Sequence, residues 1–115
     1  NPFKFLNNIK KSSNFQILHI PLDLSVNSIV RKSVILKARK NVGHLHFYNK
    51  DIIFYDLKRL NFHIIDYFYT FNNNIYKKGN ISQKIFAIFR RLIYFINRDF
   101  AVNYLGGFSL MILTK

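Results

Sequence analysis

Paired basic residues beside Tyr or Phe are the side chains of this sequence best suited to chemistry. Lysine and arginine bind phosphate through charge-assisted hydrogen bonds, and aromatic rings offer bases a surface for stacking. The basic clusters are Lys10-Lys11, Arg31-Lys32, Lys37 with Arg39-Lys40, Lys77-Lys78 and Arg90-Arg91. Each cluster alone is equally typical of a solvated surface. Together they favour nucleic-acid binding.

The net charge of the chain points the same way. Eighteen Lys and Arg residues stand against five acidic residues, which gives +13 over 115 residues. A surface this basic needs a polyanionic partner to offset self-repulsion, which argues against an ordinary metabolic enzyme. Residues 1–40 carry a net +7, residues 41–80 carry +2 and residues 81–115 carry +4. The two ends are therefore the basic parts.

Candidate catalytic and metal-binding residues are few. His44 and His46 lie two apart and would share one face of a strand, but the chain has no Cys to complete a metal site and the nearest carboxylate is that of Asp51. Ser109 follows Gly106-Gly107 without the glycine spacing of a nucleophile elbow or a phosphate loop, so a tight turn is the better interpretation. We therefore predict no enzyme, no cofactor and no metal site.

Hydrophobic residues make up 50% of the chain and aromatic residues 17%, which predicts a packed core beneath the basic surface. A helix needs about 20 apolar residues to span a membrane. The longest stretch without a charge, residues 100–114, is shorter than that. We predict no membrane span. The aromatic content also exceeds what so small a core needs, which predicts contacts with neighbouring proteins.

Periodicity predicts a helix, a strand, a helix and a hairpin in the first half. A short basic helix starts at Pro2, and an apolar strand over residues 15–20 is stopped by Pro21. Ser25 caps a second helix that Gly43 ends.

A hairpin is expected next, with strands at residues 42–48 and 51–57 flanking Asn49-Lys50. In the second half, residues 62–71 read as a strand that ends at the Asn72–Asn74 turn, and residues 77–80 read as another turn.

The segment 81–96 fits a strand and a helix equally, and we expect a strand near residues 92–95. A short helix is expected over residues 97–104. Gly106-Gly107 then turns into a last strand, residues 108–113.

Several strings, taken in order, resemble the family of bacterial-type small-subunit ribosomal protein eight. An Asn1-Pro2 start leads to the string Leu6 to Lys11, and Ile20-Pro21 ends the first strand. The other similar strings are Leu36-Lys37, Gly43-His44-Leu45, Leu57-Lys58-Arg59, Ile93-Tyr94 and Gly106-Gly107-Phe108.

The resemblance implies an α+β fold of two small helix-and-sheet halves packed together. These are residues 1–58, an α/β half of helix, strand, helix and hairpin, and residues 59–115, a mainly β half. The family's last loop and strand have no counterpart after Thr114 and Lys115. We expect a shortened homologue or a separate chain that completes the C-terminus.

The expected function is that of a structural constituent of a mitochondrial small ribosomal subunit, in a protist with a strongly A/T-biased genome. It would bind the central domain of the small-subunit rRNA and support its assembly, next to neighbouring ribosomal proteins; a plastid-type organelle is the alternative location. The resemblance assigns RNA contacts to Lys10, Lys11, Thr114 and Lys115. The basic clusters add Arg31, Lys32, Arg90 and Arg91. The alternatives are another organelle-encoded ribosomal protein and an accessory subunit of a mitochondrial membrane complex.

Overall fold

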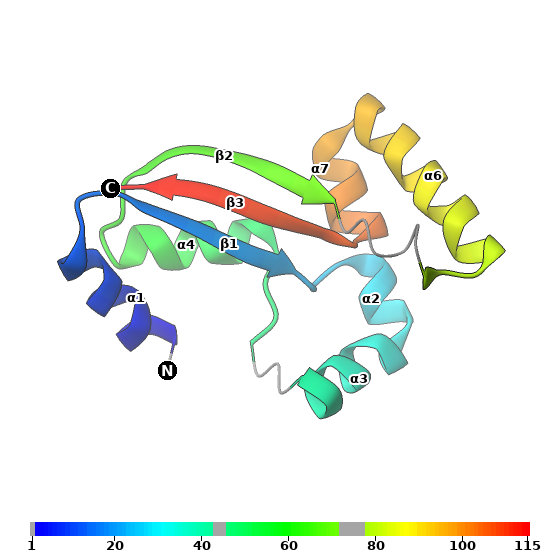
Figure 1. Cartoon of the computed structure of the whole chain (residues 1–115), viewed down its shortest axis with the longest axis horizontal. Helices are drawn as coiled ribbons and strands as arrows, with labels where there is room; N and C mark the ends of the chain where they lie inside the picture. Colours follow the sequence, from blue (N-terminus) through cyan, green and yellow to red (C-terminus); the bar gives the residue numbers. More distant parts are fainter. Residues whose placement is uncertain (1, 43–45, 72–77) are drawn as a thin grey trace.

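The computed structural model describes residues 2–42, 46–71 and 78–115. Three strands form one antiparallel sheet, with helices on one of its faces and at one of its ends (Figure 1). The strands are β1 (Gln16–Leu22), β2 (Ile64–Phe71) and β3 (Phe108–Thr114). The helical elements are α1 (Pro2–Ser12), α2 (Val26–Val30), α3 (Lys32–Val42), α4 (Lys50–Arg59), α6 (Ile81–Ile96), α7 (Arg98–Phe100) and the π-helical turn η1 (Ala101–Leu105). The predicted α+β class is confirmed.

β3 is the central strand of the sheet, with β1 on one side and β2 on the other. Gln16 pairs with Thr114 at one end of the β1–β3 ladder, and Leu22 pairs with Phe108 at the other. The expectation that Pro21 stops the first strand is wrong, because β1 continues through Pro21 to Leu22. An edge strand tolerates proline, since only one of its sides must donate to the ladder.

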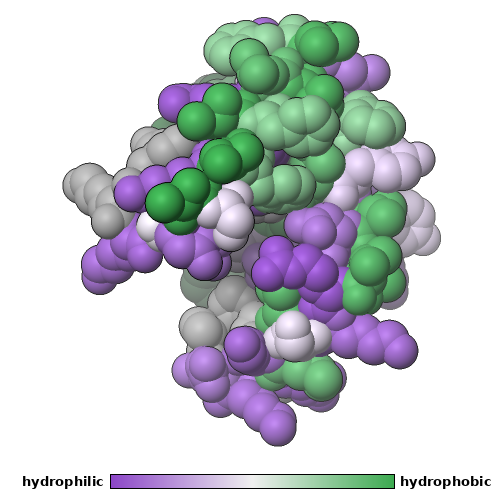
Figure 2. Space-filling model, turned by 90° about the vertical axis from the view of Figure 1, so that its right-hand side faces the viewer, coloured by the Kyte–Doolittle hydropathy of each residue, from purple (hydrophilic) through white to green (hydrophobic). Residues whose placement is uncertain are grey.

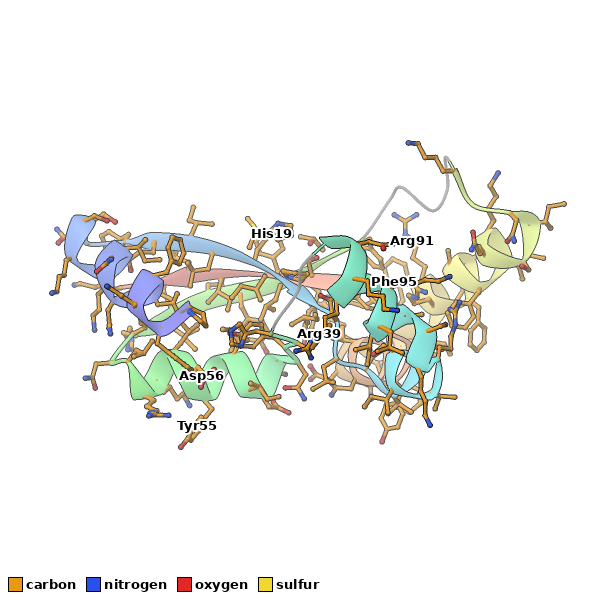
Figure 3. The ribbon with its side chains drawn as sticks, turned by 90° about the horizontal axis from the view of Figure 1, so that it is seen from below. His19, Arg39, Tyr55, Asp56, Arg91 and Phe95 are labelled. Atoms are coloured by element: carbon orange, nitrogen blue, oxygen red, sulfur yellow. The ribbon has the colours of Figure 1, made fainter. Side chains whose placement is uncertain are left out.

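The hydrophobic core lies between the sheet and the helices α1 and α4. Burial alternates along β3, so that one of its faces points into the core and the other is only partly covered. This core includes Leu6 of α1, Ile53 and Leu57 of α4, and Leu110 and Ile112 of β3. It continues to the helices at the end of the sheet through Phe108, Tyr94 of α6, and Ala101 and Val102 of η1. Tyr55 points from α4 away from the sheet, and His19 lies on the opposite face of the sheet (Figure 3).

The predicted hairpin around Asn49-Lys50 is wrong, because a helix occupies its second arm. The Asn49 side chain accepts a hydrogen bond from the backbone N–H of Ile52 at 2.8 Å and so caps α4. Ile53 and Leu57 then lie one turn apart on the buried face. Burial at a spacing of four residues, together with the cap, outweighs the β-propensity of this stretch.

The strand expected near residues 92–95 is also wrong, because residues 81–96 form the single helix α6. Asn80 and Gln83 make a reciprocal capping box that starts this helix. The tertiary structure buries Ala87, Arg90 and Tyr94, which recur at helical intervals.

The remaining predicted elements are largely confirmed. α1, β2 and β3 agree with the predicted helix and strands, and α7 with η1 covers the helix expected over residues 97–104. Ser25 caps α2 as predicted, but the second helix is broken at Arg31 into α2 and α3. Asn72–Asn74, Lys77, Gly43 and His44 lie outside the described residues.

The predicted division of the chain falls at Lys58, which lies within α4. β1 from the first part pairs with β3 from the second, so the two parts share one sheet. Among the described helices, none is both long enough and apolar enough to cross a membrane.

Candidate nucleic-acid interface

Arg31 and Arg90, which are far apart in the sequence, line the same cavity. It has a volume of ≈ 250 Å³ and lies between α2, α6 and the turn that precedes β3. A neighbouring hollow of ≈ 310 Å³ is lined by the same two arginines together with Ser82, Gln83 and Phe86. Figure 2 looks onto this end of the molecule, where hydrophilic side chains gather below hydrophobic ones. The fold therefore brings together two of the predicted RNA-binding residues.

A polar network holds α2 at the wall of the cavity. The backbone N–H of Ser28 donates to Ser25 Oγ at 3.2 Å, and the backbone N–H of Ser25 donates to Ser28 Oγ at 2.8 Å. Asn27 Nδ2 donates to the carbonyl oxygen of Leu105 at 3.1 Å, which ties α2 to the end of η1. Arg31, at the C-terminal cap of α2, is positioned by this network.

Gly106 and Gly107 allow the opposite wall to approach closely. Their φ angles are 67° and 80°, in the region that side-chain-bearing residues rarely adopt. A Cβ on Gly106 would lie 2.3 Å from Ser25 Oγ, and one on Gly107 would lie 2.2 Å from Arg90 Nη1. The sequence suggested only a tight turn at this pair. The structure shows that the two glycines also leave room for Ser25 and Arg90.

Arg90 reaches the cavity from the buried face of α6. Only 9% of Arg90 is exposed, and its guanidinium carbon lies 5.0 Å from the centre of the Phe86 ring. An arginine held against an aromatic ring and a glycine backbone has little rotational freedom left. Its planar donors are therefore well ordered for binding an oxyanion.

Asp23 adds a carboxylate to the same cavity. The lining therefore holds two guanidinium groups, one carboxylate and the hydroxyls of Ser25, Ser28 and Ser109. This set can bind an anionic group and accept hydrogen bonds from hydroxyl groups next to it.

Lys10 and Lys11 have different surroundings, although the sequence predicted the same role for both. Lys10 Nζ donates to the carbonyl oxygen of Leu60 at 3.2 Å and to that of Asn61, and lies 5.1 Å from the centre of the Phe62 ring. It therefore satisfies carbonyl groups at the end of α4. Lys11 is exposed.

Thr114 and Lys115 also differ. Thr114 is completely buried, and its hydroxyl donates to Gln16 Oε1 at 3.2 Å, so the side chain does not reach the surface. Lys115 is exposed, with its ammonium 5.8 Å from the centre of the Phe15 ring. Its backbone pairs with His63 through two hydrogen bonds of 2.8 Å.

The other predicted contacts lie around the cavity or beyond it. Lys32 is exposed at the start of α3, next to Arg31. Arg91 is exposed on α6, with its guanidinium carbon 5.1 Å from the centre of the Phe71 ring. His46 stacks on Tyr48 with 6.4 Å between ring centroids. No group of three potential metal-ligating side chains occurs within residues 2–42, 46–71 and 78–115.

A second polar cluster connects α4, β2 and α7. Lys50 Nζ lies 2.7 Å from Asp99 Oδ1, and the Tyr69 hydroxyl donates to the same oxygen at 2.6 Å. The hydrogen bonds from Lys50 and Tyr69 lower the pKa of Asp99. Burial and the hydrogen bond to Asp99 raise the pKa of Tyr69. Burial alone would lower the pKa of Lys50, but the hydrogen bond and charge of Asp99 raise it above its ordinary value.

This second cluster joins structural elements and was not predicted. Its members come from three separate segments, and nothing in their local spacing indicates that they meet. By contrast, the Asn80 and Gln83 capping box at the start of α6, the helix that carries Arg90, has a recognisable spacing in the sequence.

No family model, no curated protein and no solved structure matches this chain.

Proposed function

We propose that this protein binds structural RNA as a constituent of the small subunit of a mitochondrial ribosome. The observation that carries the proposal is the shared cavity of Arg31 and Arg90 on a chain with a net charge of +13. Two guanidinium groups that converge on one hollow suit a backbone phosphate, which arginine binds with two parallel hydrogen bonds.

The mixed lining of the cavity favours RNA over DNA. A ribose 2′-hydroxyl next to the bound phosphate is a hydrogen-bond donor, and Asp23 offers it an acceptor. Recognition of the 2′-hydroxyl is how a protein distinguishes RNA from DNA at one site.

Exposed lysines supply the second part of the binding. Lys11, Lys32 and Lys115 are exposed and contact phosphates along the RNA, and release of counterions adds affinity that falls with salt. The role is architectural, because such contacts hold the geometry of the bound RNA without reading its sequence.

The ribosomal part of the proposal rests on the resemblance to small-subunit ribosomal protein eight. That resemblance implies the central domain of the small-subunit rRNA as the binding site, neighbouring ribosomal proteins as partners and the mitochondrion as the location. The helix α4 stands where the family's hairpin was expected. RNA binding itself is supported by the cavity and the charge and does not depend on the resemblance.

The decisive experiment compares Arg31→Ala with Arg39→Ala. Both variants remove an exposed arginine, but only Arg31 lines the cavity. Binding to small-subunit rRNA is measured over a range of salt concentrations. We expect Arg31→Ala to weaken binding about tenfold and to reduce the salt slope by about 0.7 to 0.9, because one phosphate contact is lost. Arg39→Ala should have a clearly smaller effect. Equal losses in the two variants would contradict the assignment of the cavity.

A cofractionation experiment tests the ribosomal assignment separately. We expect the protein to sediment with small ribosomal subunits at low salt and to leave them at high salt. Recovery with a detergent-solubilised membrane complex would instead support the accessory-subunit alternative. Crosslinks to rRNA outside the central domain would favour a different ribosomal protein.

A further inference from the structure

The outer face of α6 is apolar and exposed. Seven of its side chains are each 50% exposed or more. These residues, which we call the α6 stripe, are Ile81, Ile85, Ile88, Phe89, Leu92, Phe95 and Ile96. Figure 2 shows hydrophobic side chains gathered over the upper part of this end of the molecule, where α6 lies. An apolar surface of this extent on one helix is typical of an interaction site.

The spacing of the stripe is that of a seam between two helices. Ile81, Ile85, Ile88, Leu92 and Phe95 recur at alternating intervals of four and three residues. This is the pattern by which apolar side chains of one helix pack into holes on a partner helix. The stripe therefore fits an elongated helical partner.

The helix is already ordered before any partner binds. Ala87, Arg90 and Tyr94 are buried on the opposite side, and the Asn80 and Gln83 capping box fixes the first turn. Because α6 is pre-formed, binding of a partner does not carry the entropic cost of ordering this helix.

The charges beside the stripe indicate what the partner must carry. Lys84 and Arg91 lie seven residues apart, on the same edge of the stripe, and both are exposed. α6 contains no acidic residue. A partner helix with carboxylates beside its own apolar seam would be attracted to this edge.

A second copy of the chain is a poor occupant of the stripe. In an antiparallel pair of α6 helices, the edges with Lys84 and Arg91 would face each other, so like charges would repel. In a parallel pair, these edges would face the opposite edge of the stripe, which offers no carboxylate because α6 contains no acidic residue. The net charge of +13 adds repulsion between whole molecules.

We propose that α6 docks an amphipathic helix of another protein, one whose apolar heptad seam is flanked by Asp or Glu. This inference goes beyond RNA binding and does not depend on it, because no residue of the α6 stripe lines the cavities of Arg31 and Arg90.

Two synthetic helical peptides test the proposal by calorimetric titration against the full chain. They share one Ile/Leu heptad seam, with Glu at the flanking positions of the first and Lys at those of the second. We expect the Glu peptide to bind about tenfold more tightly. The double variant Lys84→Glu with Arg91→Glu should reverse this preference, and Ile88→Asp with Leu92→Asp should abolish binding of both peptides. All four side chains are exposed, although Arg91 also packs over the Phe71 ring, so circular dichroism checks that each variant keeps the fold.

Three outcomes would overturn the proposal. Equal binding of the two peptides to the unmodified chain would remove the role of charge. Self-association in sedimentation that disappears with Ile88→Asp and Leu92→Asp would assign the stripe to a second copy. Binding to vesicles of phosphatidylcholine and phosphatidylserine, without binding of either peptide, would assign the stripe to a lipid surface.

Discussion

The guanidinium group of Arg90 lies so close to Gly107 that a single added carbon would collide with it. A Cβ on Gly107 would come within 2.2 Å of Arg90 Nη1 and 2.8 Å of its Cζ. A residue buried on one helix therefore depends on the absence of a side chain in a turn on another segment. A side chain at position 107 would therefore displace the guanidinium group of the cavity's second arginine.

Gly107→Ala should destabilise the fold and weaken RNA binding together. The φ of 80° strains any residue with a Cβ, so we expect a loss of about 1–3 kcal/mol, and the guanidinium end of Arg90 must shift to make room. Urea unfolding measures this change in the free energy of unfolding. In the background of Arg90→Ala the collision disappears and only the backbone strain remains, so Gly107→Ala should cost less there. The same cost in both backgrounds would show that the collision does not matter.

The Lys50–Asp99 pair should stabilise the protein over a defined pH window. The pKa of Asp99 is lowered in the fold, so its contribution is complete above its ordinary value of 3.8 and is lost as the pH falls through the lowered value. The pKa of Lys50 is raised, so its contribution is complete below 10.5 and is lost as the pH rises through the raised value.

Lys50→Met tests this window by urea unfolding at several pH values. The difference from the unmodified protein should be about 1 kcal/mol or less, because more than half of the Asp99 side chain is exposed. It should be constant across neutral pH and shrink at both extremes. A difference that keeps the same size down to strongly acidic pH would rule out the pairing with Asp99.

Asn49→Ala should destabilise α4, because it removes the side-chain cap at Ile52. The expected loss is about 1 kcal/mol. Asn41→Ala is the matched control, since Asn41 is exposed inside α3, where alanine is the better helix former. Chemical denaturation of both variants gives the comparison. Equal stability of the two variants would contradict the role of Asn49 as the cap of α4.

Lys10→Ala and Lys11→Ala should separate stability from RNA binding. Lys10 holds two carbonyl oxygens after α4, so its loss should lower the free energy of unfolding by about 1–2 kcal/mol. Lys11 is exposed, so its removal should change stability by less than about 0.5 kcal/mol while weakening RNA binding. Indistinguishable unfolding curves for the two variants would argue against the structural role of Lys10.

Much of the fold is predictable from local patterns. The alternation of burial along β3 follows the alternation expected for a half-buried strand, and Pro2 and Ser25 start α1 and α2 in the usual way. Positive φ angles at Gly106 and Gly107 agree with the predicted turn before β3. These features depend on residues that are close in sequence.

The wrong secondary-structure predictions concern segments rich in β-branched and aromatic residues. Residues 51–57 and 92–95 have the composition of strands, but tertiary burial at helical intervals decides in favour of α4 and α6. The capping signals at Asn49 and Asn80 favour helices and are visible in the sequence.

The candidate site is predictable only in part. Basic pairs pointed to Arg31 and Arg90, but nothing local shows that the two residues share a cavity, because that depends on how α2, α6 and the turn before β3 pack. For the same reason the burial of Thr114 and the engagement of Lys10 could not be foreseen.

The central position of β3 also determines when the protein can fold during synthesis. β1 and β2 do not pair with each other, and each finds its partner only in residues 108–114. A nascent chain that has not reached Phe108 therefore carries two strands with open hydrogen-bonding edges, and it lacks the core side chains Phe108, Leu110 and Ile112. Contacts between residues as distant as Gln16 and Thr114 also close slowly. Unpaired strand edges favour aggregation, and the net charge of +13 opposes it by keeping partly folded chains apart.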